Sequence, residues 1–356
     1  MILNRYVATQ IAVHITTVLL VIAIIDLMLS TLSEWTYALE GDYQAMDAFW
    51  YVLATSPSRL YDIFPIIALI GCLTGLGALA NSSQITVMRA TGISQTQIAL
   101  KVLIPALVIM LGVTLVGETL VPKAEQFGQS FRSVKGQKSG GIRHGVWHRE
   151  KNEFIFMAAV TPEGEIRGLT RYVMDENGRP IGQIKAEKAQ FMGDHWQMHQ
   201  VEEVLIAPKE GQALPTMSTQ TQSVLGWQSN VTPDLLNILL VEPNRLPLGS
   251  LITYLGFLIN EEVDTRKYQL AFWTKVLKPV MTLSLVLVAI SFIFGPLREV
   301  ATGTRVFVGV LVGVVIKMGQ NLLAPASLVY GINPFIAAAI PIAFCTLLGL
   351  YLLRRS

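Results

Sequence analysis

The position of its apolar runs constrains this chain more than any other feature. Two blocks, residues 6–121 and 268–353, hold apolar runs long enough to cross a bilayer, whereas the polar block between them holds none. About 20 apolar residues suffice for one span, because a helix rises about 1.5 Å per residue and the hydrocarbon core is about 30 Å thick. The pattern predicts a polytopic α-helical membrane protein with one polar domain inserted into it.

Six such runs are present, three on each side of the polar block. They cover residues 6–29, 60–80, 98–120, 268–294, 305–323 and 335–353. An even number of spans places both termini on one side of the membrane, and the excess of basic residues identifies that side as the cytoplasm. The basic residues that flank the spans there are Arg5, Arg89, Lys101, Arg298, Arg305, Arg354 and Arg355. The opposite loop, 30–47, has acidic residues but no Lys or Arg, and Arg59 is the main exception to the bias.

The polar block, 122–267, is then extracytoplasmic, and its pattern is that of β-structure. Short stretches rich in β-branched and aromatic residues are separated by turn residues, which predicts a β-sandwich or jelly roll. The predicted strands cover 144–149, 153–160, 165–174, 182–192, 195–207 and 216–227. Residues 232–266 have helical signals and are expected to tether the strands to the fourth span. The predicted domains are 1–121, 122–267 and 268–356, a 3+3 arrangement of spans around an inserted β domain.

Several function classes lack the residues that they need. The segment 136–140 lacks the glycine spacing of a phosphate-binding loop, and no Ser/His/Asp constellation stands out, so the chain is not expected to be an enzyme. The histidine pairs 144/148 and 195/199 lie in predicted strands, where that spacing favours a structural role over a metal site. Positive and negative residues are interspersed along the polar block, which argues against a nucleic-acid surface. We expect no metal and no cofactor bound by this chain.

A short segment between the second and third spans has the pattern of a surface helix. Ser82 or Ser83 is expected to cap it, and Gly92 to end it in a left-handed conformation. Its apolar residues Ile85, Val87 and Met88 lie toward one side. The segment is either an interfacial linker or a coupling helix that docks in a groove of a separate ATPase.

Charged residues near or inside the spans are the candidates for ligand contact, because an unpaired charge in hydrocarbon is costly. Lys317 falls near the bilayer midplane and is expected to face a polar cavity or an anionic ligand, although a partnered structural lysine is the alternative. Asp26 and Glu118 lie toward the outer ends of their spans, where they are expected to extend to the interface. The remaining cations predict a positive rim that suits lipid phosphates, with a merely solvated rim as the alternative: Arg59, Arg132, Lys135, Lys138, Lys275 and Lys278.

Several motifs together resemble one known family, the LptF/LptG permeases of the lipopolysaccharide-export ABC transporter of Gram-negative bacteria. The motifs are Phe64-Pro65, Gly75-Leu76-Gly77, ITVMRATG at 85–92, YQLAFW at 268–273, SFIFGPLR at 291–298 and LVYGI at 328–332. The last two segments are closer to the LptG branch than to the LptF branch. The resemblance covers essentially the whole chain.

The resemblance implies a bacterial inner-membrane protein with a periplasmic jelly roll and a defined set of partners. These are an LptF paralogue, a dimeric LptB ATPase that binds ATP and magnesium, LptC and the bridge protein LptA. The first and fifth spans would line lateral gates to a cavity for lipopolysaccharide, with candidates Ile22, Asp26, Leu29, Phe307 and Leu311. The ATPase would dock on Ser83, Gln84, Ile85, Met88, Arg89 and Gly92.

Two departures from the family pattern bear on these expectations. Gln84 stands where relatives often have a glutamate, and residues 30–42 lack lysines that relatives often have after the first span. Docking is then expected to rely on hydrogen bonding and burial of Ile85 and Met88, and phosphate recognition on other cations.

The expected function is extraction of lipopolysaccharide from the outer leaflet of the inner membrane, driven by the partner ATPase. The lipid would then pass along the jelly roll, where Phe154, Phe156 and Phe191 are candidates for its path, although each of them is also a candidate for the domain core. A non-transporting scaffold that recruits periplasmic partners is the alternative function. An envelope-lipid enzyme would need a nucleophile or a metal cluster.

Overall fold

The structure is a computed structural model of the 356-residue chain. It describes residues 2–38, 44–125, 127–128, 146–150, 152–160, 164–175, 178–207, 216–233, 235–236, 243–260, 264–295 and 300–355. These residues form two compact units: a helical unit of Met1–Lys135 with Arg266–Ser356, and a β unit of Gly136–Thr265. The units change at 135/136 and 265/266, whereas the domain boundaries predicted from the sequence are 121/122 and 267/268.

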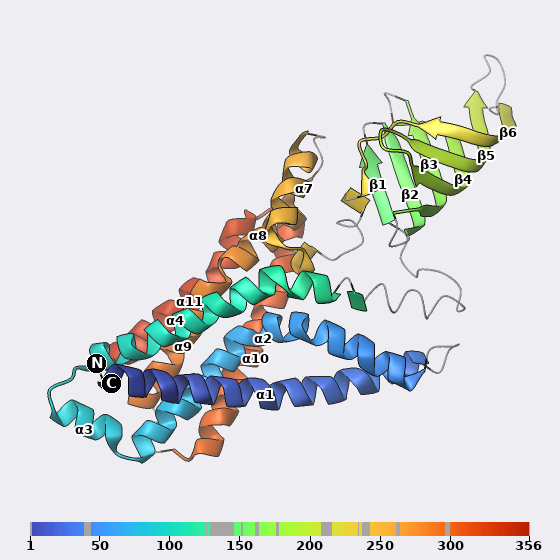
Figure 1. Cartoon of the computed structure of the whole chain (residues 1–356). Helices are drawn as coiled ribbons and strands as arrows, with labels where there is room; N and C mark the ends of the chain where they lie inside the picture. The colour runs from blue at the N-terminus through green and yellow to red at the C-terminus, as the bar shows by residue number, and fades with distance from the viewer. Residues whose placement is uncertain are drawn as a thin grey trace. The chain divides into compact units, whose positions relative to one another are not determined.

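The helical unit contains the predicted spans. Its helices are α1 (Ile2–Ala38), α2 (Ala45–Asn81), α3 (Gln84–Ala90), α4 (Gln95–Thr119), α8 (Arg266–Val276), α9 (Lys278–Phe294), α10 (Thr302–Tyr330) and α11 (Pro334–Arg355). Among the described residues, five helices are long and apolar enough to cross a membrane, or six when α8 and α9 count as one bent span. The two termini lie close together at one end of this unit (Figure 1). The predicted fold class, a polytopic helical membrane protein with an inserted β domain, is confirmed.

The loop predicted at 30–47 is largely helical. α1 continues to Ala38, and α2 begins at Ala45, well before the predicted start of the second span at residue 60. Both helices have 37 residues, more than the bilayer requires. Hydropathy predicts only the apolar part of each helix. The helical backbone hydrogen bonds continue beyond that part. Glu40 and Asp42 of the predicted loop lie outside the described residues, as does Arg298.

The fourth span is broken, which corrects the prediction of one continuous helix over 268–294. α8 and α9 meet at Leu277 with a bend of 50°. Pro279 stands in the first turn of α9, where it has no N–H to donate to the preceding turn. The proline therefore interrupts the helical hydrogen bonds that would continue from α8, and a new helix starts at Lys278.

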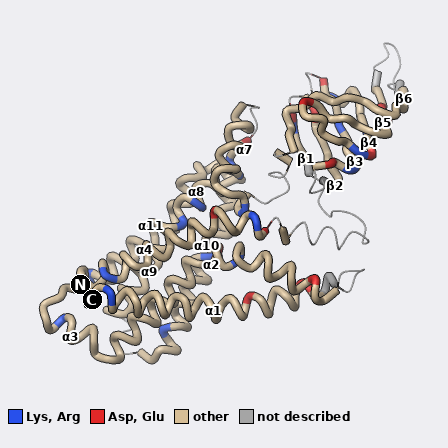
Figure 2. Tube along the Cα trace, viewed as in Figure 1, with Lys and Arg blue, Asp and Glu red and all other residues tan. Residues whose placement is uncertain are grey.

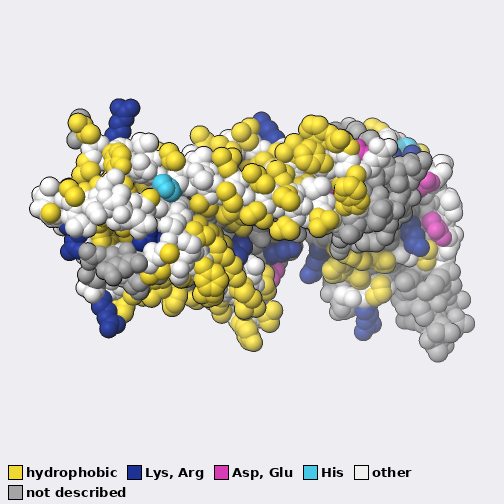
Figure 3. Space-filling model, turned by 90° about the horizontal axis from the view of Figure 1, so that it is seen from below, with side chains coloured by type: hydrophobic (Ala, Val, Ile, Leu, Met, Phe, Trp, Pro, Cys, Tyr) yellow, Lys and Arg dark blue, Asp and Glu magenta, His cyan; other side chains and the backbone are white. Residues whose placement is uncertain are grey.

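The core of the helical unit lies around α2 and α9. Buried side chains from α1, α2, α4 and α9 form one apolar cluster, including Ile11, Leu69, Val102 and Ile290. α2 is buried along most of its length, while the fully buried apolar residues described on α1, Val7, Ile11 and Ile15, all lie in its first half. α10 buries few residues and packs along α2. Apolar side chains cover much of the remaining surface of the helices (Figure 3), as expected for a surface that faces lipid or other apolar helices.

The β unit is built on one antiparallel sheet. Its strands are β1 (Val146–Glu150), β2 (Glu153–Val160), β3 (Ile166–Met174), β4 (Pro180–Phe191), β5 (Trp196–Ala207) and β6 (Thr216–Trp227), paired in chain order. A jelly roll would place strands of distant sequence side by side in two sheets. The described strands instead form a single meander, because short connections such as those at Gly178 and Gly193, both with positive φ, return each strand beside its predecessor.

One face of this sheet is buried. Met157, Leu169, Ala186 and Val201 stand opposite one another across four strands, and all four are buried. The segment after β6 returns to the same core, since Trp196 Nε1 donates a hydrogen bond of 2.7 Å to the Val231 carbonyl. The 3-10 turn Pro243–Arg245 and α7 (Leu248–Asn260) follow in the helical part that the sequence predicts.

Candidate functional site

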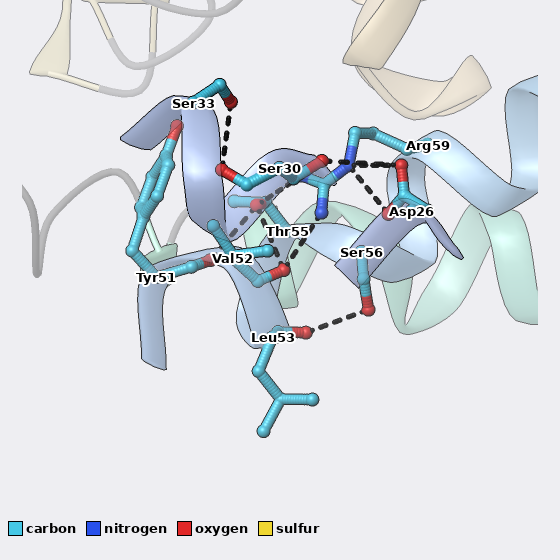
Figure 4. Close-up of polar contacts among 9 residues, drawn as sticks. All are labelled: Asp26, Ser30, Ser33, Tyr51, Val52, Leu53, Thr55, Ser56 and Arg59. Atoms are coloured by element: carbon cyan, nitrogen blue, oxygen red, sulfur yellow. Dashed lines mark hydrogen bonds and ion pairs between the residues drawn. The ribbon is translucent and has the colours of Figure 1, made fainter. Parts of the chain in front are cut away.

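The first group of charged residues joins α1 to α2. Asp26 of α1 accepts two hydrogen bonds from Arg59 Nε of α2, at 3.1 and 3.0 Å (Figure 4). The same guanidinium donates to Thr55 Oγ1 at 2.7 Å and to the Val52 carbonyl at 3.1 Å. The carboxylate of Asp26 therefore neutralises Arg59, the basic residue that is the main exception to the charge bias, while its extension to the interface stays a prediction.

The second group lies at the break between α8 and α9. Lys275 Nζ contacts Glu118 Oε1 of α4 at 3.1 Å, and Lys278 Nζ contacts Asp62 Oδ1 of α2 at 2.9 Å. Both lysines are buried, and Lys278 also lies 3.6 Å from the centroid of the Tyr61 ring. Each ammonium thus has a carboxylate beside it, which offsets the cost of burial. Glu118, like Asp26, thus has a basic partner on another helix.

Three of the predicted rim cations are therefore neutralised inside the helical unit. Arg59, Lys275 and Lys278 each have a carboxylate partner, so contact with a lipid phosphate at any of them requires displacement of that carboxylate. The acidic partner of Lys278 carries no signal in the sequence, since Asp62 and Lys278 are 216 positions apart. Arg132, Lys135 and Lys138 lie outside the described residues and stay predictions.

Lys317 of α10 differs from these cations. It is half-buried and lies close enough to Lys278 to interact with it electrostatically. In the described part of the chain it forms no ion pair or hydrogen bond. A half-buried cation without an ion-pair partner among the described residues favours an anionic ligand in a membrane helix.

The predicted coupling segment is a helix, α3. Ile85 and Met88 are buried in the core cluster, whereas Val87 is exposed. Gly92 has φ +89°, which confirms the left-handed end, but the predicted serine cap is wrong: Ser83 is itself left-handed, with φ 59°, and its side chain caps nothing. Arg89, near the end of α3, is exposed, and Figure 2 shows basic residues on α3 and near both termini.

The predicted gate residues lie on two separate helices that both pack on α2. Leu29 of α1 and Phe307 and Leu311 of α10 are exposed, while Ile22 packs partly against the core. These exposed apolar side chains require lipid or another apolar helix around them.

The three aromatic candidates of the β unit divide between two environments. Phe191 packs against buried Trp196 at 5.2 Å between ring centroids, so it belongs with the core. Phe154 and Phe156 lie on the opposite face, where Trp147 is exposed and its ring lies 5.0 Å from that of Phe156. Tyr172 stacks on Trp147 at 5.9 Å and extends this aromatic face.

Glu165 of the β unit forms an ion pair with Arg167. Glu165 accepts hydrogen bonds from Gln190 and from Arg167, and these lower the pKa of its carboxyl. Among the residues that the structure describes, no group of three metal-ligating side chains comes together.

Comparison with known proteins decides the family. The model of the family described as "Lipopolysaccharide export system permease LptF/LptG" matches residues 5–355. The chain belongs to the LptF/LptG family. A relative from Escherichia coli strain K12, named lipopolysaccharide export system permease protein LptG, is 33% identical over 100% of this chain and 98% of its own length. A relative of the same name from Haemophilus influenzae is 29% identical over 99% of this chain and 98% of its own length.

Membership in the LptF/LptG family makes the chain a multi-pass inner-membrane transport subunit of lipopolysaccharide export. Within that family role, the described structure singles out Lys317, the paired charges beside it and the aromatic face of the β unit.

Proposed function

We propose that this chain takes lipopolysaccharide sideways from the outer leaflet of the inner membrane and passes it to a periplasmic bridge. In this proposal both termini are cytoplasmic and the β unit is periplasmic, in agreement with the basic residues near the termini. Lys317 carries the proposal, because it is a half-buried cation in a membrane helix without an ion-pair partner among the described residues. A lipid phosphate supplies the anion that it lacks.

The acyl chains have apolar surfaces to follow. Leu29, Phe307 and Leu311 present exposed side chains on α1 and α10, which supports entry of the lipid between these helices and those of a paralogous partner. Phosphates contact Lys317 first, and then reach Arg59, Lys275 or Lys278 only as their carboxylate partners are displaced. Arg132, Lys135 and Lys138 are further phosphate contacts in this proposal.

The energy comes from a separate subunit. ATP and magnesium bind to a dimeric LptB-type ATPase, which docks on α3 through Gln84, exposed Val87 and Arg89, while this chain holds no cofactor. An LptF-type paralogue completes the cavity, and LptC- and LptA-type proteins receive the lipid. The exposed face around Trp147, Phe154 and Phe156 supports a path along the β unit, whereas Phe191 stabilises its core.

Site-specific photocrosslinking in cells tests the proposal. A crosslinker at Lys317, Ile22 or Phe156 is expected to capture lipopolysaccharide, at the two helical positions without ATP hydrolysis and at Phe156 only with it. Phe344 of α11, also exposed and apolar, is the matched control for contact with bulk lipid.

The same experiment separates transport from its alternative. A scaffold that only recruits partners gives no adducts above the Phe344 control while export continues. Equal adducts at all four positions, independent of the ATPase, would also contradict the proposed path.

A further inference from the structure

One row of residues on α10 lies in close contact with α2. Arg305, Gly309 and Gly313 follow one another at intervals of four, and all three are buried. A Cβ on Gly309 would lie 2.7 Å from Leu73 Cδ1, and one on Gly313 would lie 2.6 Å from Ile66 Cγ2. The two helices therefore approach more closely than side chains at these positions would permit.

Arg305 is the polar end of this row. Its side chain is fully buried, and its Nη2 donates a hydrogen bond of 3.0 Å to Asn81 Oδ1. A Cβ on Gly77 would lie 2.5 Å from Arg305 Nη1 and 3.1 Å from its Cδ. The guanidinium thus occupies the space that a side chain at position 77 would need, and it fixes the start of α10 to the last turn of α2.

Asn81 is the last residue of α2, and α3 begins three residues later. The connection is short and bonded: the N–H of Ser82 donates to the Ala78 carbonyl, and the N–H of Ser83 donates to the Ala80 carbonyl. Ile85 and Met88 further join α3 to the core. A displacement of α3 therefore moves the end of α2 that holds Arg305.

We propose that Arg305 is a positioning residue that transmits displacement of α3 to α10 through Asn81. The inference rests on the proposed function, in which α3 docks the ATPase. Lys317 lies twelve residues after Arg305 on the same continuous helix, about 18 Å along its axis by helical rise. α10 thus connects the end that receives the movement to the cation that holds the lipid.

A merely structural role for Arg305 makes a different prediction. It would lower the stability of the assembled complex, and any loss of transport would follow the loss of assembled protein. Transmission by Arg305 instead predicts that ATP hydrolysis continues while lipid release per ATP falls.

The test uses the complete complex with its ATPase in lipid nanodiscs loaded with lipopolysaccharide. Asn81→Leu removes the acceptor of the Arg305 Nη2 hydrogen bond and is expected to lower lipid release per ATP about tenfold, because a hydrogen bond from a buried charged group is lost. Asn81→Asp keeps an oxygen acceptor and is expected to restore the ratio to within about twofold of the parent chain. Thr304→Val, at the exposed position next to Arg305, is the matched control and should leave the ratio unchanged.

Spin labels on the same complex report the movement directly. With labels at exposed Val87 and Phe307, ATP is expected to leave the distance between α3 and α10 unchanged, while the distance from Phe307 to Phe344 of α11 changes. In Asn81→Leu, ATP should change the distance from Val87 to Phe307. The distance from Phe307 to Phe344 should no longer respond to ATP.

An Asn81→Leu complex with a parental ratio of lipid release to ATP hydrolysis would overturn the inference. If that variant fails to assemble, Arg305→Lys decides: it keeps the charge but loses the planar fork, and a parental ratio would again overturn the inference. Failure of the parent chain to bind the ATPase at all would instead refute the proposed function.

Discussion

Two outer helices, α1 and α10, pack on the same central helix in different ways. α1 is closest to α2 in its first half, where a Cβ on Gly71 would lie 2.7 Å from the Ile15 Cα. Among the side chains of its second half whose burial is described, no apolar one is fully buried, and the ion pair of Asp26 with Arg59 joins this half to α2. α10 instead begins with its closest contact, formed by Arg305 and two glycines.

The difference indicates which parts of each helix can move. Backbone contact through a glycine leaves no room for sliding or tilting without a clash. A partly exposed ion pair, in contrast, can exchange its carboxylate for another anion. The second half of α1 is therefore the part of this pair of helices most easily separated from α2.

The largest effect is expected from Gly71→Ala. The new Cβ meets backbone atoms of Ile15, which cannot rotate away, so we expect a loss of about 2–3 kcal/mol in the free energy of unfolding. Thermal unfolding of the purified chain in detergent measures it. A melting temperature equal to that of the parent would show that α1 is not held closely here.

A smaller effect is expected from Asp26→Leu. Arg59 would keep its bonds to Thr55 and Val52 but lose its carboxylate, at a cost of about 1–2 kcal/mol, since both side chains are partly exposed. Spin labels at Leu29 and Leu53 should show a longer and broader distance distribution. Ser33→Ala, on the same part of α1, is the control, and identical distributions for the two variants would contradict the role assigned to the ion pair.

A still smaller loss of stability is expected from Gly309→Ala, where α10 contacts α2. Its new Cβ meets the tip of Leu73, a flexible side chain that can rotate, so about 1 kcal/mol should be lost. Comparison of this melting temperature with that of Gly71→Ala ranks the two contacts directly. An equal or larger loss at position 309 would reverse the comparison between α1 and α10.

The smallest effect, of opposite sign, is expected from Gly319→Ala. Nothing lies within 4 Å of the added Cβ, and alanine is the better helix former, so the chain should gain about 0.5 kcal/mol. A loss at this position would show that α10 has a close neighbour there that the described residues do not supply.

The sequence predicts the elements better than their contacts. Each of the six strands begins and ends within two residues of its predicted range, because period-two patterning and turn residues are local signals. Their pairing into one meander differs from the sandwich or jelly roll that the pattern predicts, because strand patterning does not specify which strands pair. Pro279 indicates the break at Leu277 in the sequence. The long apolar run nevertheless predicts one continuous span over 268–294.

The candidate site shows the same division. Lys317 can be predicted from the sequence because it interrupts an apolar run. Among the described residues it has no ion pair, whereas Arg59, Lys275 and Lys278 each have a carboxylate partner. The partners of Lys275 and Lys278 could not be predicted, since each pair joins positions more than 150 residues apart. The sequence predicts Arg305 only as a basic residue that flanks a span. Its burial depends on Gly77 of another helix, which the pattern around Arg305 does not indicate.

The sequential pairing of the β-strands also bears on how the chain is made. Each strand of the meander after β1 pairs with the strand synthesised just before it, so hairpins can close during synthesis with little loop entropy to overcome. α2 meets α9 only after about two hundred further residues have been synthesised. The inserted sheet can therefore form before the first helices of the chain have packed against α9.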